Sequence, residues 1–288
     1  MILDKKNITS TIAISISESP DTEVLGLSDR HLQDAAVKIA LHLLSAGRSL
    51  AYGGDLRTKG FTDLLFELAL RYRGHPHHNG IITVTNYLAW PIHISMTADE
   101  LEKYVSEYHG TAQLVLIGEE GKRVSMEDRK ALSSREPDDS ERSNGLTAMR
   151  QVMCEETDAR ILLGGHVEDY KGRMPGIAEE ALLSLQVNQP VFLIGGFGGC
   201  ARDIAETVGL VEPWAGSRQD WLGRERFKCY GPDSLHNGLS TEENHLLVQT
   251  PYIDQSMSLV LKGLHRLRNS KAKDDLNQEE GNYAQGVY

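Results

Sequence analysis

Short apolar runs alternate with amphipathic stretches along most of the chain. Six of these runs carry apolar residues in succession, as do strands that are covered on both faces of a sheet. They span residues 11–17, 48–55, 80–87, 111–118, 159–165 and 190–196. Apolar residues recur at helical spacing over 28–46, 60–72, 97–108, 146–156, 176–187 and 201–208. This alternation implies right-handed crossovers, and it predicts an α/β, Rossmann-like, doubly wound fold whose mainly parallel sheet is flanked by helices.

The predicted α/β domain covers residues 8–210 and is followed by a different region. Over 211–270 the alternation stops, and the pattern predicts a loop and helical extension whose helix breaks or kinks at Pro251. The polar tail, 271–288, is predicted to be disordered. Inside the domain, the charge-rich segment 119–144 predicts a solvated helix followed by a mobile loop.

The composition restricts the partners and the location of the protein. Hydrophobic residues make up 40% of the 288 residues, and 41 acidic against 30 basic residues give a net charge of −11. That charge disfavours nucleic acid and anionic membranes as partners, because binding to either draws on a cationic surface. The N-terminus has no cleavable signal, no apolar run reaches the length of a membrane span, and three widely spaced cysteines predict no disulfide framework. We therefore expect a cytoplasmic protein without a membrane partner.

Glycines and small polar residues gather where the predicted strands end. The residues at these ends are Ser15 and Ser17; Gly53, Gly54 and Asp55; Gly164, Gly165 and His166; and Gly196, Phe197 and Gly198. In an open parallel sheet, ligands bind beyond the carboxyl ends of the strands, at the switch in strand order. Glycine there leaves backbone amides free, and the following helix adds its positive end, so the pattern predicts a site for nucleotide phosphate. The simpler alternative is that each glycine serves only a turn with positive φ.

Neither of the common phosphate-binding fingerprints is present. No G-x-G-x-x-G follows the first predicted strand, and the absence of G-x-x-x-x-G-K-[ST] excludes an ATP-hydrolysing P-loop. Arg57 and Arg173 are predicted to bind the phosphate instead, since each precedes a helix start at a strand end. The alternative for both is a solvated surface position. Phe61, Pro175 and Gly176 complete the predicted ligand-binding set.

Two acids, Glu179 and Glu180, lie in the first turn of a predicted helix. Acids there complement the helix dipole without any further role, which is the simpler interpretation. The functional alternatives are a carboxylate that holds a ribose hydroxyl and one that assists glycosidic cleavage. Because the helix start favours the charged form, we expect an acceptor of hydrogen bonds rather than a proton donor. No metal or cofactor is expected, because His75, His77 and His78 have no acidic or cysteine partner at ligand spacing.

Four stretches of the sequence carry a resemblance to a known family. They read SIS (15–17), YGGDLRTKGFTDLL (52–65), LTAMR (146–150), and a long stretch from TDARILLGG to GGFGGCARDIAE (157–206). In this order they resemble the SLOG superfamily, the Rossmann-like group of the Smf/DprA proteins, the cytokinin-activating LOG enzymes and the N-terminal regions of melastatin-type TRP channels. The chain looks most similar to bacterial SLOG modules found with TIR or sirtuin-like domains in antiphage systems. This resemblance implies binding of an NAD-derived or related nucleotide.

The LOG enzymes indicate which residues would be catalytic in such a family. Their motif P-G-G-x-G-T-x-x-E supplies a glutamate that, with a nearby arginine, supports removal of the base from a nucleoside monophosphate. This chain has R-M-P-G-I-A-E-E, so the resemblance assigns these roles to Arg173 and Glu180. The double glycine and the Gly-Thr pair of the motif are not intact, which argues against catalysis more than against binding.

Two functions follow as the main alternatives. The first is a sensor domain that recognises a nucleotide signal such as ADP-ribose or cyclic ADP-ribose. The second is a nucleotide N-glycosidase or phosphoribohydrolase that uses Glu179 or Glu180 with Arg173. DNA processing of the DprA kind is a third, which the net charge of −11 disfavours. As partners we expect a second copy, in a dimer or tetramer, because the C-terminal helix is apolar and two tryptophans precede it, and an effector protein that provides the output.

Overall fold

A single sheet of seven strands forms the centre of the computed structural model, which describes residues 10–72, 82–214 and 220–285, with the backbone alone over 271–285. Its order is β5-β4-β3-β2-β1-β6-β7, and all neighbouring pairs are parallel except β4 and β5. The strands are β1 (Thr11–Ser17), β2 (Ser49–Tyr52), β3 (Val84–Ala89), β4 (Ala112–Ile117), β5 (Arg123–Val124), β6 (Ala159–Gly164) and β7 (Val191–Ile194). The predicted Rossmann-like α/β fold is confirmed. The sequence does not predict β5, because two residues are too few to form an apolar run.

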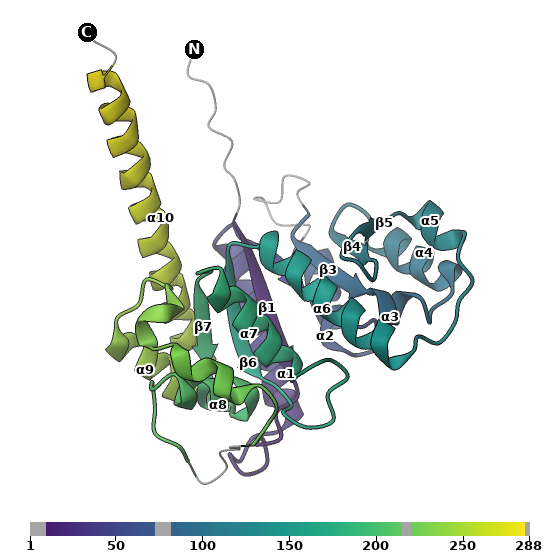
Figure 1. Cartoon of the computed structure of the whole chain (residues 1–288), viewed down its shortest axis with the longest axis horizontal. Coiled ribbons are helices and arrows are strands. Elements are labelled where there is room, and N and C mark those ends of the chain that lie inside the picture. The colour runs from purple at the N-terminus through teal and green to yellow at the C-terminus, as the bar shows by residue number, and fades with distance from the viewer. Residues whose placement is uncertain (1–9, 73–81, 215–219, 286–288) are drawn as a thin grey trace.

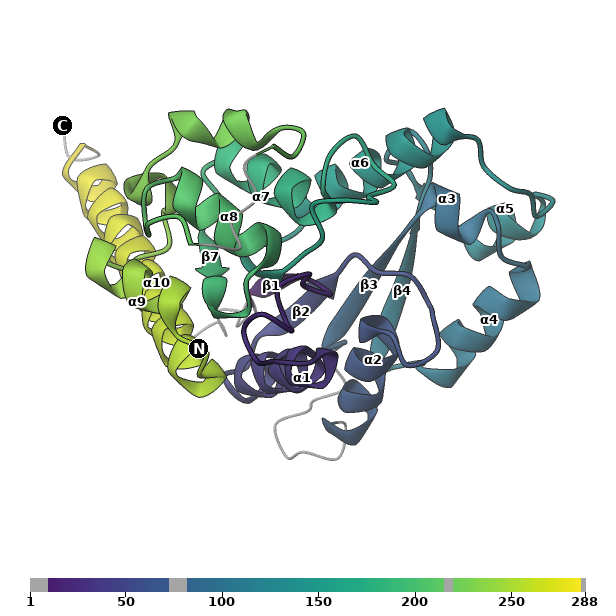
Figure 2. The same cartoon turned by 90° about the horizontal axis from the view of Figure 1, so that it is seen from below.

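Helices cover both faces of the sheet, which gives a molecule of three layers (Figures 1 and 2). Helices α1, α2 and α10 pack on one face, and α6, α7 and α8 pack on the other. The α-helices of the described residues are α1 (Asp29–Ser45), α2 (Phe61–Tyr72), α3 (Trp90–His93), α4 (Ala98–Glu107), α5 (Met126–Lys130), α6 (Asp139–Glu155), α7 (Gly176–Gln186), α8 (Gly199–Thr207), α9 (Thr241–Gln249) and α10 (Ile253–Gln285). Short 3-10 turns are η1 (Gly195–Phe197), η2 (Arg224–Cys229) and η3 (Pro232–Leu235).

The core lies on both faces of β1, an inner strand of the sheet. Ile12, Ile14 and Ile16 are buried together with the inner side of α1. Ala13 points to the opposite face, where it packs with Met149 of α6. Successive side chains of a strand alternate between faces, so a strand covered on both faces needs apolar residues in succession. This is why the pattern of apolar runs predicts the strands well.

The strand order reverses between β1 and β6. From β1 the chain builds β2, β3 and β4 outward in one direction, and it then returns to place β6 on the other side of β1. Ser17, at the end of β1, lies opposite Gly164, at the end of β6. The end of β2, which Gly53 follows, reaches the same edge because β2 runs parallel to β1. The two glycine pairs therefore share the carboxyl edge of the sheet, where doubly wound folds bind their ligands.

The charge-rich segment 119–144 contains the predicted helix followed by a loop, and it also contains further elements. It forms β5, the short helix α5, and the first turn of α6. The side chain of Asp138 accepts a hydrogen bond from the amide of Glu141, and the Glu141 side chain bonds back to the Asp138 amide. This capping box begins the helix within a polar stretch, before the apolar spacing becomes visible.

The C-terminal region contains the break that Pro251 predicts. Helix α9 ends at Gln249, and α10 begins at Ile253. Helix α10 then continues to Gln285, although the sequence predicts a disordered tail there. Its last turns contain Lys, Gln and Glu, which are polar but favour helix, so polarity alone does not indicate where a helix ends. Within the described residues, no helix combines the length and the apolar content needed to cross a membrane.

Candidate functional site

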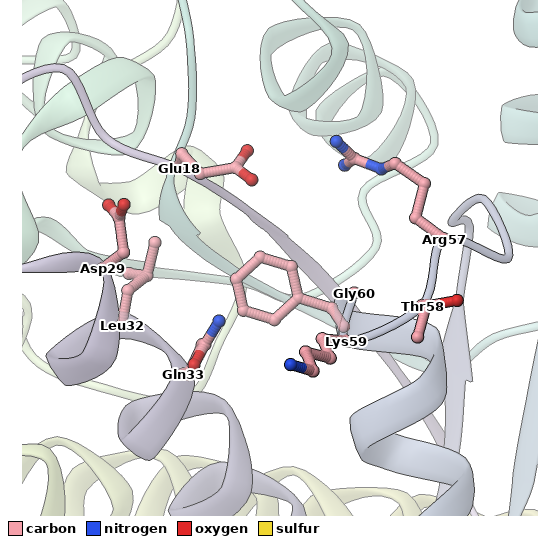
Figure 3. Close-up of a pocket in the computed structure, with 9 residues that line it drawn as sticks. Glu18, Asp29, Leu32, Gln33, Arg57, Thr58, Lys59 and Gly60 are labelled. Atoms are coloured by element: carbon pink, nitrogen blue, oxygen red, sulfur yellow. The ribbon is translucent and has the colours of Figure 1, made fainter.

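A polar pocket opens at the carboxyl edge of the sheet, between the starts of α1 and α2 (Figure 3). The connection from β1 to α1 forms one wall, the connection from β2 to α2 forms the other, and the volume is about 160 Å³. The lining residues of this α1–α2 pocket are Glu18, Asp29, Leu32, Gln33, Arg57, Thr58, Lys59, Gly60 and Phe61. Two of them, Arg57 and Phe61, belong to the ligand-binding set that the sequence predicts.

The two walls of the α1–α2 pocket carry opposite charges. Glu18 and Asp29 belong to the α1 side, and Arg57 and Lys59 to the α2 side. Figure 3 shows the Glu18 carboxylate and the Arg57 guanidinium extending toward each other across the pocket. Nε of Arg57 also lies 2.7 Å from Oδ2 of Asp55, which ties the guanidinium to its own loop. A ligand in this pocket meets hydrogen-bond acceptors on one side and positive charge on the other.

The surroundings of Glu18 favour its ionised form. Burial raises its pKa, but a hydrogen bond from its own backbone amide, a hydrogen bond from His166 and the positive charge of Arg57 together bring the pKa below its usual value. Nε2 of His166 lies 3.3 Å from Oε2 of Glu18. Because His166 follows β6, side chains that follow three neighbouring strands meet at this edge.

The Gly53–Gly54 turn after β2 is tightly packed. The amide of Gly54 donates to Oδ1 of Asn86 at 3.3 Å, and Nδ2 of Asn86 donates to the Gly54 carbonyl at 3.0 Å. A Cβ on Gly54 would lie 2.1 Å from the Tyr52 ring, and one on Gly53 would lie 3.0 Å from Sδ of Met149. The expectation of a free amide does not hold for Gly54, because a fully buried asparagine of β3 already binds its peptide groups.

The Gly164–Gly165 turn after β6 needs glycine for reasons of packing. The two residues have φ angles of +66° and +102°. The Gly165 amide donates to the Ser17 carbonyl at 3.2 Å, and the Gly165 carbonyl accepts the amide of Cys200 at 2.9 Å. A Cβ on Gly165 would lie 2.8 Å from the side chain of Ile177. The simpler alternative, a turn with positive φ beneath closely packed helices, therefore accounts for this pair.

The last glycine-rich turn, after β7, binds a carboxylate of the protein itself. Oδ2 of Asp21, from the β1–α1 connection, accepts the amide of Gly199 at 2.6 Å, at the start of α8. Asp21 is buried, and a Cβ on Gly198 would collide with it. Gly196 is closely packed against backbone, and Phe197 lies in the core. These residues do not line the α1–α2 pocket. Asp21 already occupies the position at which the start of α8 would bind an anionic ligand.

Glu179 and Glu180 of α7 belong to a buried network of ion pairs. Their side chains are 9% exposed. Arg150 of α6 forms an ion pair with Glu179, and its Nε lies 3.5 Å from Oε1 of Glu180. Oγ1 of Thr147 donates to Oε1 of Glu179 at 2.6 Å. The Arg150 guanidinium lies so close to the start of α7 that a Cβ on Gly176 would be 2.7 Å from Nη2.

Glu180 faces the sheet rather than a pocket. Its Oε2 accepts hydrogen bonds from Oγ of Ser15 and, at 2.8 Å, from Nη1 of Arg160. Arg160 is fully buried, and its Nε donates to Oγ of Ser184 at 2.8 Å. Two guanidinium groups thus balance two carboxylates away from solvent. Ser15 and Glu180 therefore have a structural role that needs no ligand.

Arg173 lines a second pocket, on the opposite face of the sheet. This pocket has a volume of about 430 Å³ and lies between α6, α7 and residues 222–226. Nη2 of Arg173 donates to Oδ1 of Asn144 at 2.6 Å. Glu179 also lines this pocket. Pro175, two residues beyond Arg173, precedes the first residue of α7, as the sequence predicts.

The structure corrects two expectations about the arginines. Arg57 and Arg173 do not share one crevice, because they line different pockets on opposite faces of the sheet. Arg173 also does not meet Glu180, because the connection from β6 to α7 carries Arg173 over α6 while Glu180 points toward β1. The arginines that contact the acidic pair are Arg150 and Arg160.

Several charged residues of the site are absent from the sequence-based set. Glu18 directly follows a strand end, Asp29 opens α1, and Lys59 closely precedes α2, so position at the carboxyl edge is the signal that could have found them. Arg160 also has a signal, since it is the one charged residue in the buried run of β6. Among the described residues, no group of three His, Cys, Asp or Glu side chains could hold a metal ion. His75, His77 and His78 lie outside the described residues.

A doubly wound parallel sheet with a charged pocket at its carboxyl edge defines a Rossmann-like nucleotide-binding class of protein. Residues 6–247 match the model of the family described as SLOG cluster2. The chain therefore belongs to the SLOG cluster2 family, within the SLOG superfamily that its motifs resemble. This membership indicates a nucleotide-binding domain. A comparison with curated proteins gave no significant match.

Proposed function

We propose that this protein is a sensor that binds an NAD-derived nucleotide, of the ADP-ribose or cyclic ADP-ribose type, without cleaving it. The observation that carries the proposal is the α1–α2 pocket at the carboxyl edge. There, Arg57 and Lys59 are placed to bind phosphate, and Glu18 and Asp29 to accept hydrogen bonds from sugar hydroxyls. Phe61 adds an apolar surface to the same lining.

The state of the acidic pair supports binding without turnover. A general acid for glycosidic cleavage has to reach the leaving group and carry a proton. Glu180 is instead engaged by Ser15 and Arg160, and Glu179 by Arg150 and Thr147. Carboxylates that are already engaged by guanidinium and hydroxyl groups of the protein are not free to reach a leaving group.

The experiment that tests the sensor proposal combines binding with product analysis. The full chain is mixed with ADP-ribose, cyclic ADP-ribose, NAD and AMP, its thermal unfolding is followed, and the mixtures are then separated by chromatography. We expect stabilisation by at least one NAD-derived nucleotide and no release of base. Free base that accumulates over many turnovers would overturn the proposal, as would the absence of stabilisation by every nucleotide tested.

A nucleotide N-glycosidase is the alternative function, and one observation favours it. Glu179 and Arg173 line the same pocket, of about 430 Å³, which is large enough for a whole nucleotide. In that case Glu179, and not Glu180, is the carboxylate that meets the substrate. Glu179→Gln would then abolish release of base, whereas under the sensor proposal no base is released by either form.

The sensor proposal has consequences for partners and location. A sensor needs an output, so we propose that the chain forms a homo-oligomer, a dimer or tetramer, and acts on an effector protein in the cytoplasm. The free state of all three cysteines supports a reducing compartment. A role in antiphage signalling is proposed from the resemblance to SLOG modules that accompany TIR or sirtuin-like domains. Light scattering that gives a monomer both with and without nucleotide would contradict the oligomer.

A further inference from the structure

The α1–α2 pocket is too small for a whole nucleotide. Its volume of about 160 Å³ is roughly half of the ~300 Å³ at which pockets for complete small-molecule ligands begin. It therefore accommodates one group of the ligand, while the remainder lies along the carboxyl edge. The chemistry of the walls shows which group this is.

The two walls place acceptors and positive charge across the pocket from each other. The carboxylates of Glu18 and Asp29 both belong to the α1 side, and that of Glu18 is directed toward the guanidinium of Arg57 across the pocket (Figure 3). Lys59 also belongs to the α2 side, and its ammonium group points away from the Arg57 guanidinium. A group that bridges these walls needs hydroxyl or amino donors at one end and a negative charge at the other.

We infer that the α1–α2 pocket binds a ribose 5-phosphate group with free 2- and 3-hydroxyls. The phosphate lies against Arg57, and the hydroxyls donate to Glu18 and Asp29. The inference rests on the proposed function and names the part of the nucleotide that this pocket recognises. In ribose 5-phosphate, the diol and the phosphate project from opposite ends of one small ring, which matches the separation of the two walls.

The same arrangement discriminates against related groups. A second phosphate on the 2- or 3-hydroxyl would bring negative charge against two carboxylates. Loss of the 2-hydroxyl would leave a carboxylate without one of its donors. A nucleobase carries no negative charge that could pair with the Arg57 guanidinium. Glu18 is ionised at neutral pH, because its contacts with His166 and Arg57 lower its pKa in spite of burial, so this discrimination operates under physiological conditions.

The first test measures the dissociation constants of three small probes for the full chain by ligand-observed NMR. The probes are ribose 5-phosphate, 2-deoxyribose 5-phosphate and inorganic phosphate. A hydrogen bond to a charged group corresponds to roughly 10- to 100-fold in affinity. We therefore expect ribose 5-phosphate to bind at least about tenfold more tightly than the deoxy sugar, with inorganic phosphate weaker still. Equal affinity for the two sugar phosphates would overturn the inference.

The second test uses variants of the two walls. Glu18→Gln and Asp29→Asn should reduce the preference for ribose over deoxyribose to within about threefold without weakening inorganic phosphate. Arg57→Ala should weaken both sugar phosphates by a similar factor of about ten or more. The matched control is Arg71→Ala, an exposed arginine elsewhere on α2 that should leave all three affinities unchanged. Thermal unfolding of each variant checks that the fold is intact.

The outcomes separate this inference from the proposed function. Binding of ADP-ribose that is unaffected by Arg57→Ala would place the nucleotide elsewhere, which would overturn the inference and leave the sensor proposal standing. A preference for ribose that neither acid variant changes would also overturn the inference alone. Binding of ribose 5-phosphate with the predicted preference, but of no nucleotide, would support the subsite and overturn the sensor proposal.

Discussion

At the scale of single residues, the charged groups divide into two kinds. Arg150, Arg160, Glu179 and Glu180 pair with one another inside the protein, and of their buried side-chain atoms only Nε of Arg150 and Nη2 of Arg160 have no hydrogen-bond partner among the described residues. The charged groups of the α1–α2 pocket face an open volume. Buried ion pairs contribute little net stability, because desolvation offsets their attraction, but removal of one partner is costly. The two kinds therefore respond differently to substitution.

The buried network gives a prediction about stability. Glu180→Ala removes a carboxylate that accepts from Arg160 at 2.8 Å and leaves a fully buried guanidinium without its charge partner. We expect a loss of about 3–5 kcal/mol in the free energy of unfolding, measured in urea. Glu120→Ala, at an exposed ion pair, should cost less than about 1 kcal/mol. A similar small loss in Glu180→Ala would show that solvent reaches Arg160 after all.

His93 gives a prediction about pH. It is fully buried in α3, and Nε2 lies 3.1 Å from the Ile117 carbonyl. Burial, with a smaller contribution from the charge of Arg129, lowers its pKa from 6.5 to about 4. Because the folded pKa lies below the unfolded one, the stability due to neutral His93 is complete above pH ~6.5 and is lost as the pH falls toward 4.

The size of this loss is on the order of 2–3 kcal/mol between pH 7.5 and 4.5. Urea unfolding at several pH values should show it in the natural protein, and His93→Gln should be less sensitive to pH over the same range. Parallel pH profiles for the two proteins would mean that His93 does not titrate as a buried group.

At the scale of elements, the connections at the carboxyl edge are joined to one another. Asp21 links the β1–α1 connection to the start of α8, and His166 links the β6–α7 connection to Glu18. These contacts hold the loops that form the α1–α2 pocket. They also show that the last glycine-rich turn serves the assembly of the edge and is not itself part of the pocket.

The contact of Asp21 can be tested by its removal. Asp21→Ala leaves the buried amide of Gly199 without its carboxylate, so we expect a loss of about 1–2 kcal/mol in urea unfolding. Asp21→Asn keeps an acceptor of similar shape and should lose less. If both variants were as stable as the natural protein, the carboxylate would not cap α8 in solution.

At the scale of the whole molecule, the sheet separates two pockets. The α1–α2 pocket lies on the face covered by α1 and α2, and the second pocket lies between α6 and α7 on the other. Figure 2 shows the sheet between these two helical layers. A ligand of one pocket does not touch the other, so variants can assign nucleotide binding to a face.

Binding of a nucleotide stabilises the whole folded domain by mass action. At a ligand concentration of 100 times Kd, the gain in unfolding free energy is about 2.7 kcal/mol. We expect ADP-ribose to produce a rise in Tm that Arg57→Ala reduces and that Arg71→Ala retains. A rise that is undiminished in Arg57→Ala but reduced in Arg173→Ala would assign the nucleotide to the second pocket.

The sequence by itself determined the class of fold and the region of the site. Strands covered on both faces require successive apolar residues, so runs such as 11–17 and 159–165 locate the sheet without knowledge of its order. Parallel strands end on one edge, so residues that follow them converge there. On these grounds the sequence predicts that Arg57 and Phe61 lie near a pocket. It does not predict the short β5 or the start of α6, because neither has an apolar pattern.

Only the tertiary structure decided which residues of the edge are available to a ligand. Glycine after a strand has the same appearance in the sequence whether its amide meets a phosphate or, as at Gly54 and Gly199, a side chain from another element. Charge shows the same ambiguity, since Glu180 is paired with an arginine of a separate strand while Glu18 faces an open pocket. The hydrogen-bond or charge partner of each of these groups lies far away along the chain. Only the packing of distant segments therefore determines which partner a group has.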